Sequence, residues 1–579
     1  MGPYWPAKIH FNFSFKPLYM KIEQEDQSYQ AEKAYPLPSV IEDLNKWPIN
    51  QLYRDKKAFM DQLVAFTQDR LIAQKKGGEL AQKIAAVVYK ERQRILENPW
   101  KVDPPDELDF WGDIRRKLVK GAKLEGAEAQ AHHEQLSERI LRRYTEEITG
   151  NFKISTYKLA RILLPMLFNS ILNTMTIRKA DLRKKLRISG HVEELRSLVD
   201  KGTVVFVPTH FSNLDSILIG WAADRIGMLA FSYGAGLNLF NNKIMSYFFS
   251  RLGAYTLDRR KKNPFYLESL KSFSQLSIER GVHSLFFPGG TRSRNGALEE
   301  RLKLGLLGTA IDAQGAVLER GEKNKVYIVP VVLNYHFVLE AKSLIEQHLK
   351  YTGKELYIPE GSGFSAMGIL KYLRQFVYNS SEILVNFGQP MDVMGNFVDE
   401  EGRSLDPQGR EVDLKDYYTS AGQLCYDRQR NEVYTERLAD KIVERFRVEN
   451  VVLSSHLLAF TAFNIIKARQ KEQDLYGILR LPKEERRISQ ALLFDNLKLL
   501  RTALKELEAK GELKLSEMLA KNSLEELVAD GLQNIGAFHV NKPLFWNKKE
   551  NCYESEDLNL LYYYHNRMKA YGLHRLIKI

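Results

Sequence analysis

Residues 203–216 read TVVFVPTHFSNLDS, and this stretch decides the fold class of the chain. Its apolar run ends at Thr209, which predicts a buried β-strand. His210 follows in the loop, and Asp215 opens a segment with helical periodicity. A strand, a short loop and a helix in this order predict one unit of a parallel α/β sheet.

Further strand-like runs follow, and helical stretches separate them. They read MLAFSY, GAYTL, HSLFFP, KVYIVPVVLNY and EILVNFG. This alternation predicts an α/β fold with a mostly parallel sheet flanked by helices, and with functional loops at the carboxyl ends of the strands. Pro330 interrupts KVYIVPVVLNY, so this strand is expected to lie at an edge or to end there, because proline cannot donate to a central ladder.

Helical segments flank this α/β region on both sides. We predict a helical N-terminal region over residues 1–150 and an α/β domain over 151–395. Residues 396–416 are polar and rich in Gly and Asp, which predicts a loop or hairpin at a domain boundary. A second helical region is expected over 417–579.

Composition narrows the class of partner. The 85 Lys and Arg residues outnumber the 72 Asp and Glu residues and give a net charge of +13, which suits nucleic acid, an acidic lipid surface or a phosphorylated substrate. Only Cys425 and Cys552 are present, which argues against a disulfide framework or a zinc site and favours a cytosolic protein without a structural metal. The first residues lack the pattern of a secretory signal.

One segment favours contact with a membrane surface. Residues 158–175 read KLARILLPMLFNSILNTM, and six basic residues follow between Arg178 and Arg187. No apolar run reaches the roughly 18 residues that a spanning helix needs, so we expect a peripheral protein at the cytoplasmic face. A core helix followed by a solvated charged helix is the alternative.

Three loops after strands carry the candidate chemistry. His210 can act as a general base, and Asp215 can orient its ring; in isolation the pair also fits a helix cap and a hydrogen-bonded loop histidine. GAYTLDRRKKNP places Arg259 and Arg260 before a helix start, which suits a phosphate or a solvated charge run. SLFFPGGTRSRNG adds the glycines, hydroxyls and guanidiniums of an anion-binding loop, or of a plain turn: Gly289, Gly290, Thr291, Arg292, Ser293 and Arg294.

Together with KVYIVPVVLNYH, these motifs resemble the four sequence blocks of the glycerolipid acyltransferases. The resemblance covers Val204 to Pro390, and the continuation Ser293 to Gly296 is similar to the branch acting on glycerol 3-phosphate or dihydroxyacetone phosphate. It implies an enzyme that moves a fatty acyl group from acyl-CoA or acyl-carrier protein to glycerol 3-phosphate in phospholipid synthesis, without a cofactor.

The resemblance also implies roles for individual residues. His210 and Asp215 are expected to be catalytic, and the four arginines Arg259, Arg260, Arg292 and Arg294 to bind the substrate phosphate. Backbone amides near Gly289 and Gly290 are candidates for the oxyanion. Phe211, Leu214 and Leu218 are candidates for lining the acyl channel.

Gly289 departs from the family pattern, which has glutamate there in Phe-Pro-Glu-Gly-Thr-Arg-Ser. Asp258 is a candidate for a local substitute. Because His210, Asp215 and the arginines are present, we predict an active enzyme. Lysophosphatidate or dihydroxyacetone phosphate as acceptor, a non-catalytic lipid-binding protein, and a nucleic-acid-binding protein argued from charge alone are the alternatives.

Overall fold

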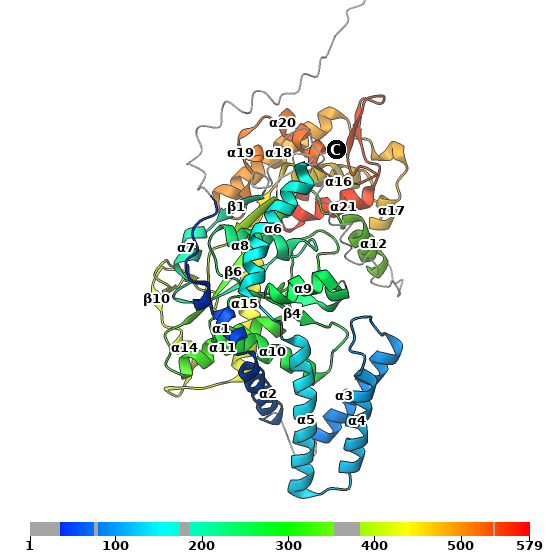
Figure 1. The fold of residues 1–579 in the computed structure, drawn as a ribbon. Coiled ribbons are helices and arrows are strands. Elements are labelled where there is room, and N and C mark those ends of the chain that lie inside the picture. Colours follow the sequence, from blue (N-terminus) through cyan, green and yellow to red (C-terminus); the bar gives the residue numbers. More distant parts are fainter. Residues whose placement is uncertain (1–34, 74–78, 174–185, 242, 353–382, 536–538) are drawn as a thin grey trace, which may run out of the picture.

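The computed structural model describes residues 35–73, 79–173, 186–241, 243–352, 383–535 and 539–579. In Figure 1 the helices α3, α4 and α5 extend from one end of the central sheet, and the C-terminal helices gather at the opposite end. The N-terminal elements are η2 (Leu44–Lys46), α1 (Pro48–Arg54), α2 (Lys56–Ala73), α3 (Glu79–Glu97), α4 (Glu107–Gly121) and α5 (Gly126–Ile148).

The N-terminal helices share a core with the sheet region. Helices α2 and α5 pack against α10 (Pro264–Glu279). Phe59 of α2 meets Phe273 of α10 edge to face, with ring centroids 5.9 Å apart. Both rings are buried, so these helices are held to the sheet region by apolar packing.

Seven strands form the central sheet, in the order β1-β7-β6-β2-β5-β3-β4. All neighbours are parallel except β6 and β7, which are antiparallel. The strands are β1 (Leu186–Gly190), β2 (Gly202–Pro208), β3 (Ser232–Gly236), β4 (Ala254–Leu257), β5 (Ser284–Leu285), β6 (Lys325–Tyr335) and β7 (Ile383–Phe387). A mostly parallel sheet flanked by helices confirms the predicted fold class.

Helices connect these strands and cover the sheet. Before β1 lies α6 (Ile154–Asn173), and the connecting elements are α7 (Val192–Ser197), α8 (Asp215–Arg225), η4 (Leu237–Asn241), α9 (Lys243–Arg251), α10, α11 (Leu304–Glu319) and α12 (Ala341–Thr352). Strand β2 is buried along almost its whole length, which accounts for its continuous apolar sequence.

The position predicted for Pro330 was wrong. Strand β6 is central, and Pro330 lies opposite Val207 of β2. The carbonyl of Pro330 accepts from Gly388 N at 2.8 Å, so the side of Pro330 that lacks an N–H faces the chain just after β7 ends. A central strand tolerates this proline because no ladder residue of β7 stands opposite it.

After β7 the chain forms a small antiparallel sheet and then a second group of helices. Strands β8 (Phe397–Val398), β9 (Ser404–Leu405) and β10 (Glu411–Val412) make the sheet, and α14 (Lys415–Tyr418), β11 (Thr419–Ser420) and β12 (Gln423–Leu424) follow. The remaining elements are α15 (Arg428–Val448), β13 (Val451–Val452), α16 (Ser454–Arg469), α17 (Leu475–Leu479), η5 (Lys483–Arg486), α18 (Gln490–Ala509), β14 (Lys514–Leu515), α19 (Glu517–Lys521), α20 (Leu524–Asn534), β15 (Phe545–Asn547), β16 (Cys552–Glu554), α21 (Leu558–His565), η6 (Asn566–Tyr571) and η7 (Leu573–Leu576).

Helix α16 is the centre of this C-terminal group. It is buried from Ser454 to Ile466 and contacts α18, α20 and α21. Among the described residues, no helix combines the length and the apolar character that crossing a bilayer requires. Most of the basic run from Arg178 to Arg187 lies outside the described residues.

Candidate active site

The end of β2 positions the candidate base. Thr209 is fixed to β6, because its N–H donates to Val331 O at 3.0 Å and its hydroxyl accepts from Leu333 N at 3.2 Å. His210 comes next, and its Nδ1 meets Asp215 Oδ2 at 2.7 Å. The structure therefore brings together the two residues predicted to be catalytic.

Asp215 is held by several donors at the start of α8. Its Oδ2 also accepts from the backbone N–H groups of Phe211 at 2.7 Å and Ser212 at 2.9 Å, and its Oδ1 accepts from the Tyr335 hydroxyl at 2.5 Å. The side chain is fully buried, and the helix start adds partial positive charge. An ionised carboxylate only accepts, so Nδ1 of His210 carries the proton and Nε2 is the basic nitrogen.

The third motif packs directly on this pair. The Phe287 ring stacks on the His210 imidazole, with centroids 3.9 Å apart and an angle of 22°. Ser293 N donates to His210 O at 2.7 Å, while the Ser293 hydroxyl donates to Ala297 O at 2.7 Å. Ser293 thus shapes the loop from within, and Thr291 is half-buried beside it.

Two glycines of this loop are required by its backbone. Gly290 has φ of +74°, and its N–H donates to Phe287 O at 2.9 Å, so this amide is used by a turn and does not point to an oxyanion. Gly296 has φ of +81°, and a Cβ there would lie 2.2 Å from the carbonyl oxygen of Tyr563. The C-terminal region therefore approaches the loop at a point where only glycine fits.

Arg292 lies next to the loop that carries His210. Its Nη1 is 3.6 Å from Glu340 Oε1, and a quarter of its side chain is exposed. Glu340 also accepts from the Ser212 hydroxyl at 3.1 Å and from Asn213 N at 3.0 Å. Arg294 is half-buried, and its charge lowers the pKa of His348 after the larger effect of burial.

The second motif has a different arrangement from the one predicted. All five N–H groups of Arg260 are used: they donate to both oxygens of Asp258, to both oxygens of Asp103 and to Asn98 O, at 2.5 to 3.1 Å. The guanidinium also lies 4.2 Å from the centre of the Trp100 ring. This geometry argues against the phosphate-binding role predicted for Arg260, because a phosphate would have to displace these acceptors.

The four cations of this motif are divided between the inside and the outside of the molecule. Lys261 is buried and pairs with Glu147 of α5 at 2.5 Å and with Glu107 of α4 at 3.5 Å. Arg259 and Lys262 are exposed. Since both oxygens of Asp258 are bound to Arg260, Asp258 does not act as the local substitute for the missing glutamate.

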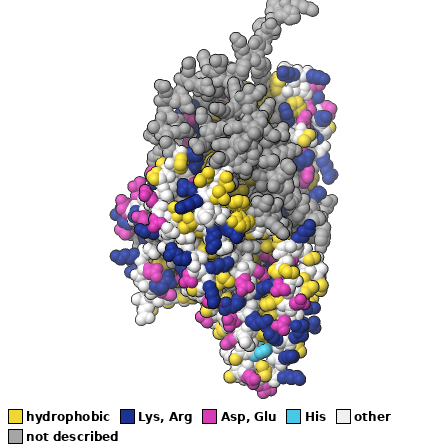
Figure 2. Space-filling view, viewed as in Figure 1, with side chains coloured by type: hydrophobic (Ala, Val, Ile, Leu, Met, Phe, Trp, Pro, Cys, Tyr) yellow, Lys and Arg dark blue, Asp and Glu magenta, His cyan; other side chains and the backbone are white. Residues whose placement is uncertain are grey.

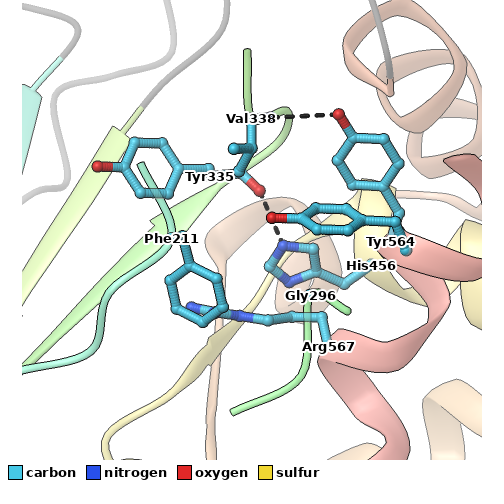
Figure 3. A pocket seen from close by; sticks show the side chains of 8 residues that line it. Phe211, Gly296, Tyr335, Val338, His456, Tyr564 and Arg567 are labelled. Carbon is cyan, nitrogen blue, oxygen red and sulfur yellow. Dashed lines mark hydrogen bonds between the residues drawn. The ribbon is translucent and has the colours of Figure 1, made fainter. Parts of the chain in front are cut away.

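A buried arginine from the C-terminal region completes the surroundings of the catalytic loop. Figure 3 shows Arg567 of η6 lying against Phe211, and the guanidinium carbon is 3.8 Å from the ring centre. Arg567 donates to Asn334 Oδ1 at 2.9 Å and to the carbonyl of Leu333. Burial lowers its pKa to about 10, while the nearby carboxylates, Glu299 first, act in the opposite direction.

The cavity drawn in Figure 3 is too small for an acyl chain. It holds about 20 Å³, close to the space of a single water, and Phe211, Tyr335, His456 and Arg567 are among its lining residues. The role predicted for Phe211 in an acyl channel is therefore not supported, because Arg567 covers its ring. Leu214 is buried and Leu218 is half-buried.

The sequence did not reveal the roles of several residues of the site. Phe287 and Tyr335 lie within the third and fourth motifs, but no role was predicted for either. Glu340 and Arg567 lie outside the four motifs. Tyr335 is itself held from the C-terminal region, since His456 Nε2 donates to its carbonyl at 2.9 Å. Only the strand ending at Tyr335, on the same sheet edge as His210, offered a signal.

Comparisons with known proteins match this chain to acyltransferases. Residues 189–334 match the family model described as Acyltransferase. A glycerol-3-phosphate acyltransferase of Aeromonas hydrophila is 28% identical over 336 residues, which cover 57% of this chain and 38% of that protein. The corresponding protein of Shewanella loihica is 24% identical over 416 residues, 72% of this chain and 46% of that protein.

One solved structure is also similar. The 1-acyl-sn-glycerophosphate acyltransferase PlsC from Thermotoga maritima is 13% identical, with a TM-score of 0.23, and the match covers 63% of this chain and 96% of that one.

The α/β fold and the His210–Asp215 site define an acyltransferase domain. Residues 189–334 form an acyltransferase domain, and the chain is similar to glycerol-3-phosphate acyltransferases, in agreement with the resemblance that the four motifs carry. It spans less than half the length of the curated relatives that it matches.

Proposed function

We propose that this protein transfers a fatty acyl group from a thioester to a hydroxyl of glycerol 3-phosphate. The observation that carries the proposal is the 2.7 Å contact between His210 and a buried Asp215. The carboxylate fixes the tautomer in which Nε2 accepts a proton. The names of the curated relatives support glycerol 3-phosphate as the acceptor.

The proposed reaction needs only the two substrates and side chains of this protein. His210 Nε2 takes the proton of the acceptor hydroxyl, whose oxygen attacks the thioester carbonyl carbon of acyl-CoA or acyl-carrier protein. The new C–O bond forms and the C–S bond breaks. The departing thiolate then takes the proton from the imidazolium, which Asp215 stabilises in the meantime.

Arg292 is the best-supported ligand for the acceptor phosphate. It lies beside the loop that carries His210, and a quarter of its side chain is exposed. A planar guanidinium binds phosphate in forked geometry. Arg259, which is exposed, and Arg294, which follows in the same loop, are additional candidates.

Substitution of His210 by alanine tests the chemistry. Acyl transfer from labelled acyl-CoA should fall by about 10²- to 10⁴-fold while the unfolding midpoint is preserved, because a positioned general base contributes that much. Wild-type protein should be offered glycerol 3-phosphate, dihydroxyacetone phosphate and lysophosphatidate in competition. Preference for either of the last two would replace the proposed acceptor, and transfer to none of them would favour a non-catalytic lipid-binding protein.

The phosphate assignment has its own test. Arg292→Ala should raise KM for glycerol 3-phosphate much more than KM for the acyl donor, since only the acceptor carries the bound phosphate. Arg301→Ala is the matched control, because Arg301 is an exposed arginine nearby in the sequence. An unchanged KM for the acceptor in the Arg292 variant would remove Arg292 from the site.

We also propose that the protein attaches to the cytoplasmic face of a membrane through α6 and the neighbouring α9. Figure 2 shows hydrophobic side chains gathered over this region. The exposed fractions are 45% for Leu159, 61% for Ile162, 43% for Leu163 and 50% for Tyr247. Apolar side chains beside cations suit the headgroup layer of an acidic membrane.

Vesicle flotation tests this attachment. Wild-type protein should float with vesicles that contain acidic lipid, and Ile162→Glu should reduce the bound fraction, since a carboxylate opposes insertion into the interface. Val119→Glu on α4 is the control, because Val119 is an apolar residue that is 64% exposed on a distant helix. Equal binding by the two variants would contradict the proposal.

A further inference from the structure

Glu299, a carboxylate outside the four motifs, binds the backbone of the candidate base His210. Its Oε1 accepts from the backbone N–H of His210 at 2.9 Å. Its other oxygen, Oε2, is buried and has no hydrogen-bond partner among the described residues. A buried carboxylate oxygen without a donor is costly, so its presence here needs an explanation.

Gly289 leaves room for this carboxylate. A Cβ built on Gly289 would lie 3.0 Å from Glu299 Cγ and 3.4 Å from Oε1. The backbone of Gly289 is not in the left-handed region, so only the available space limits a side chain at this position. The space that a residue at 289 would fill is therefore taken by Glu299, ten positions later in the sequence.

The surroundings of Glu299 link it to the rest of the site. Burial raises its pKa to about 7, against the opposing effects of the His210 amide and of Arg567. The charge of Asp215 acts in the same direction as burial. Two carboxylates thus approach one buried arginine, and the loop carrying His210 runs between them.

We propose that Glu299 is a positioning residue that holds the backbone of His210 and takes the place of the side chain missing at Gly289. The effect of Glu299 on turnover rests on the proposed acyl transfer. Its competition for space with a side chain at position 289 does not depend on that activity. A carboxylate at either position can support the His210 loop, and carboxylates at both positions exclude each other.

Single substitutions at Glu299 test the hydrogen bond. Glu299→Ala should lower kcat roughly 10- to 100-fold with little change in KM, because a small displacement of the base has an effect of that order. Glu299→Gln should retain most of the activity, since its amide oxygen can accept from the same N–H. Equal loss in both variants, or no loss in either, would overturn the positioning role.

A double substitution tests the exchange of position. Gly289→Glu alone should lower kcat and the unfolding midpoint, because two carboxyl groups would then share one space. Combined with Glu299→Ala, the same substitution should restore kcat to within a few-fold of wild type. Additive losses in the double variant would overturn the proposal.

The unfolding midpoint separates this proposal from the proposed function. If the wild-type protein transfers no acyl group, the acyltransferase assignment fails, but Gly289→Glu should still lower the midpoint in the wild-type background and not in the Glu299→Ala background. Glu449→Ala is the control, because Glu449 is a buried, ion-paired carboxylate at the end of α15. A midpoint that responds to Gly289→Glu equally in all three backgrounds would show that Glu299 and residue 289 do not compete for space.

Discussion

At the scale of single residues, the proposed catalytic pair of His210 and Asp215 depends on the hydrogen bonds that Asp215 accepts. Four groups donate to its two oxygens, and three of them come from the loop it supports. The carboxylate therefore binds the His210 ring and also holds the backbone of the loop in place. A substitution tests the role of the charge alone only if the new side chain has the same size as aspartate.

Asp215→Asn meets this condition. The amide oxygen can still accept from His210 Nδ1 and from the two backbone N–H groups, but no negative charge is left to stabilise the imidazolium, so kcat should fall about 10²- to 10⁴-fold. Turnover and the unfolding midpoint should be measured together. A variant with near wild-type kcat would remove Asp215 from the mechanism, and the tautomer can be read from the nitrogen shifts of the His210 ring by NMR.

At the scale of elements, the C-terminal helices contribute to a site that lies mainly on the sheet. Arg567 of η6 covers Phe211, and His456 of α16 holds Tyr335, whose hydroxyl reaches Asp215. The contact is close at Gly296 as well, where the backbone of Tyr563 leaves no room for a Cβ. The sheet and the C-terminal helices therefore form the site together.

Arg567→Met tests this joint construction. The thioether can still cover Phe211, but the acceptors Leu333 O and Asn334 Oδ1 lose their donor, and the carboxyl groups of Glu299 and Asp215 lose their counter-charge. Removing one partner of such a buried set destabilises by about 3–5 kcal/mol. Urea unfolding should detect this loss, and Arg575→Met, an exposed arginine in the same region, should leave the midpoint close to wild type.

Elements built from long apolar runs were predictable from the sequence. The run at Val204 to Val207 gave β2, and the positions of His210 and Asp215 followed from it. The run MLAFSY was less informative, because β3 begins only at Ser232. Residues 228–231 are buried but do not pair with a neighbouring strand. An apolar run therefore indicates burial, and it indicates a strand only where the buried residues also pair with another strand.

The directions of charged side chains were not predictable in the same way. Arg259 to Lys262 form one continuous basic run, yet Arg260 turns inward to Asp103 in the loop between α3 and α4, and Lys261 turns inward to Glu147 of α5. Glu299 could not be singled out from the sequence, because its proposed role depends on the absence of a side chain at Gly289. Contacts between segments far apart in the chain decide such roles, and a single sequence does not record them.

At the scale of the whole molecule, buried histidines make the free energy of unfolding depend on pH. His283 is buried, and its Nδ1 accepts from Val204 N at 3.1 Å. Burial lowers its pKa from 6.5 to about 4, and burial likewise lowers the pKa of His539 to about 4 and of His565 to about 3. Below pH 6.5 the unfolded chain binds more protons at these residues than the folded one does, so stability falls as the pH falls.

The expected loss from His283 alone is about 3 kcal/mol between pH 6.5 and 4, since each unit of pKa shift corresponds to about 1.4 kcal/mol. His283→Asn keeps an acceptor for Val204 N and removes the titration. Urea unfolding at several pH values should therefore give a shallower pH dependence in this variant. His574→Asn, at an exposed position, is the control, and parallel curves for the His283 variant and wild type would contradict the prediction.

The contact between Arg567 and Phe211 also has a consequence for protein synthesis. A ribosome adds Arg567 about 350 residues after His210, which at roughly 5–20 residues per second is a delay of about 20 to 70 s. During this time the strand and loop with His210 can emerge and begin to fold, but the guanidinium that covers Phe211 does not yet exist. A nascent chain that ends before Arg567 therefore leaves the Phe211 ring uncovered, and Leu333 O and Asn334 Oδ1 lack their donor.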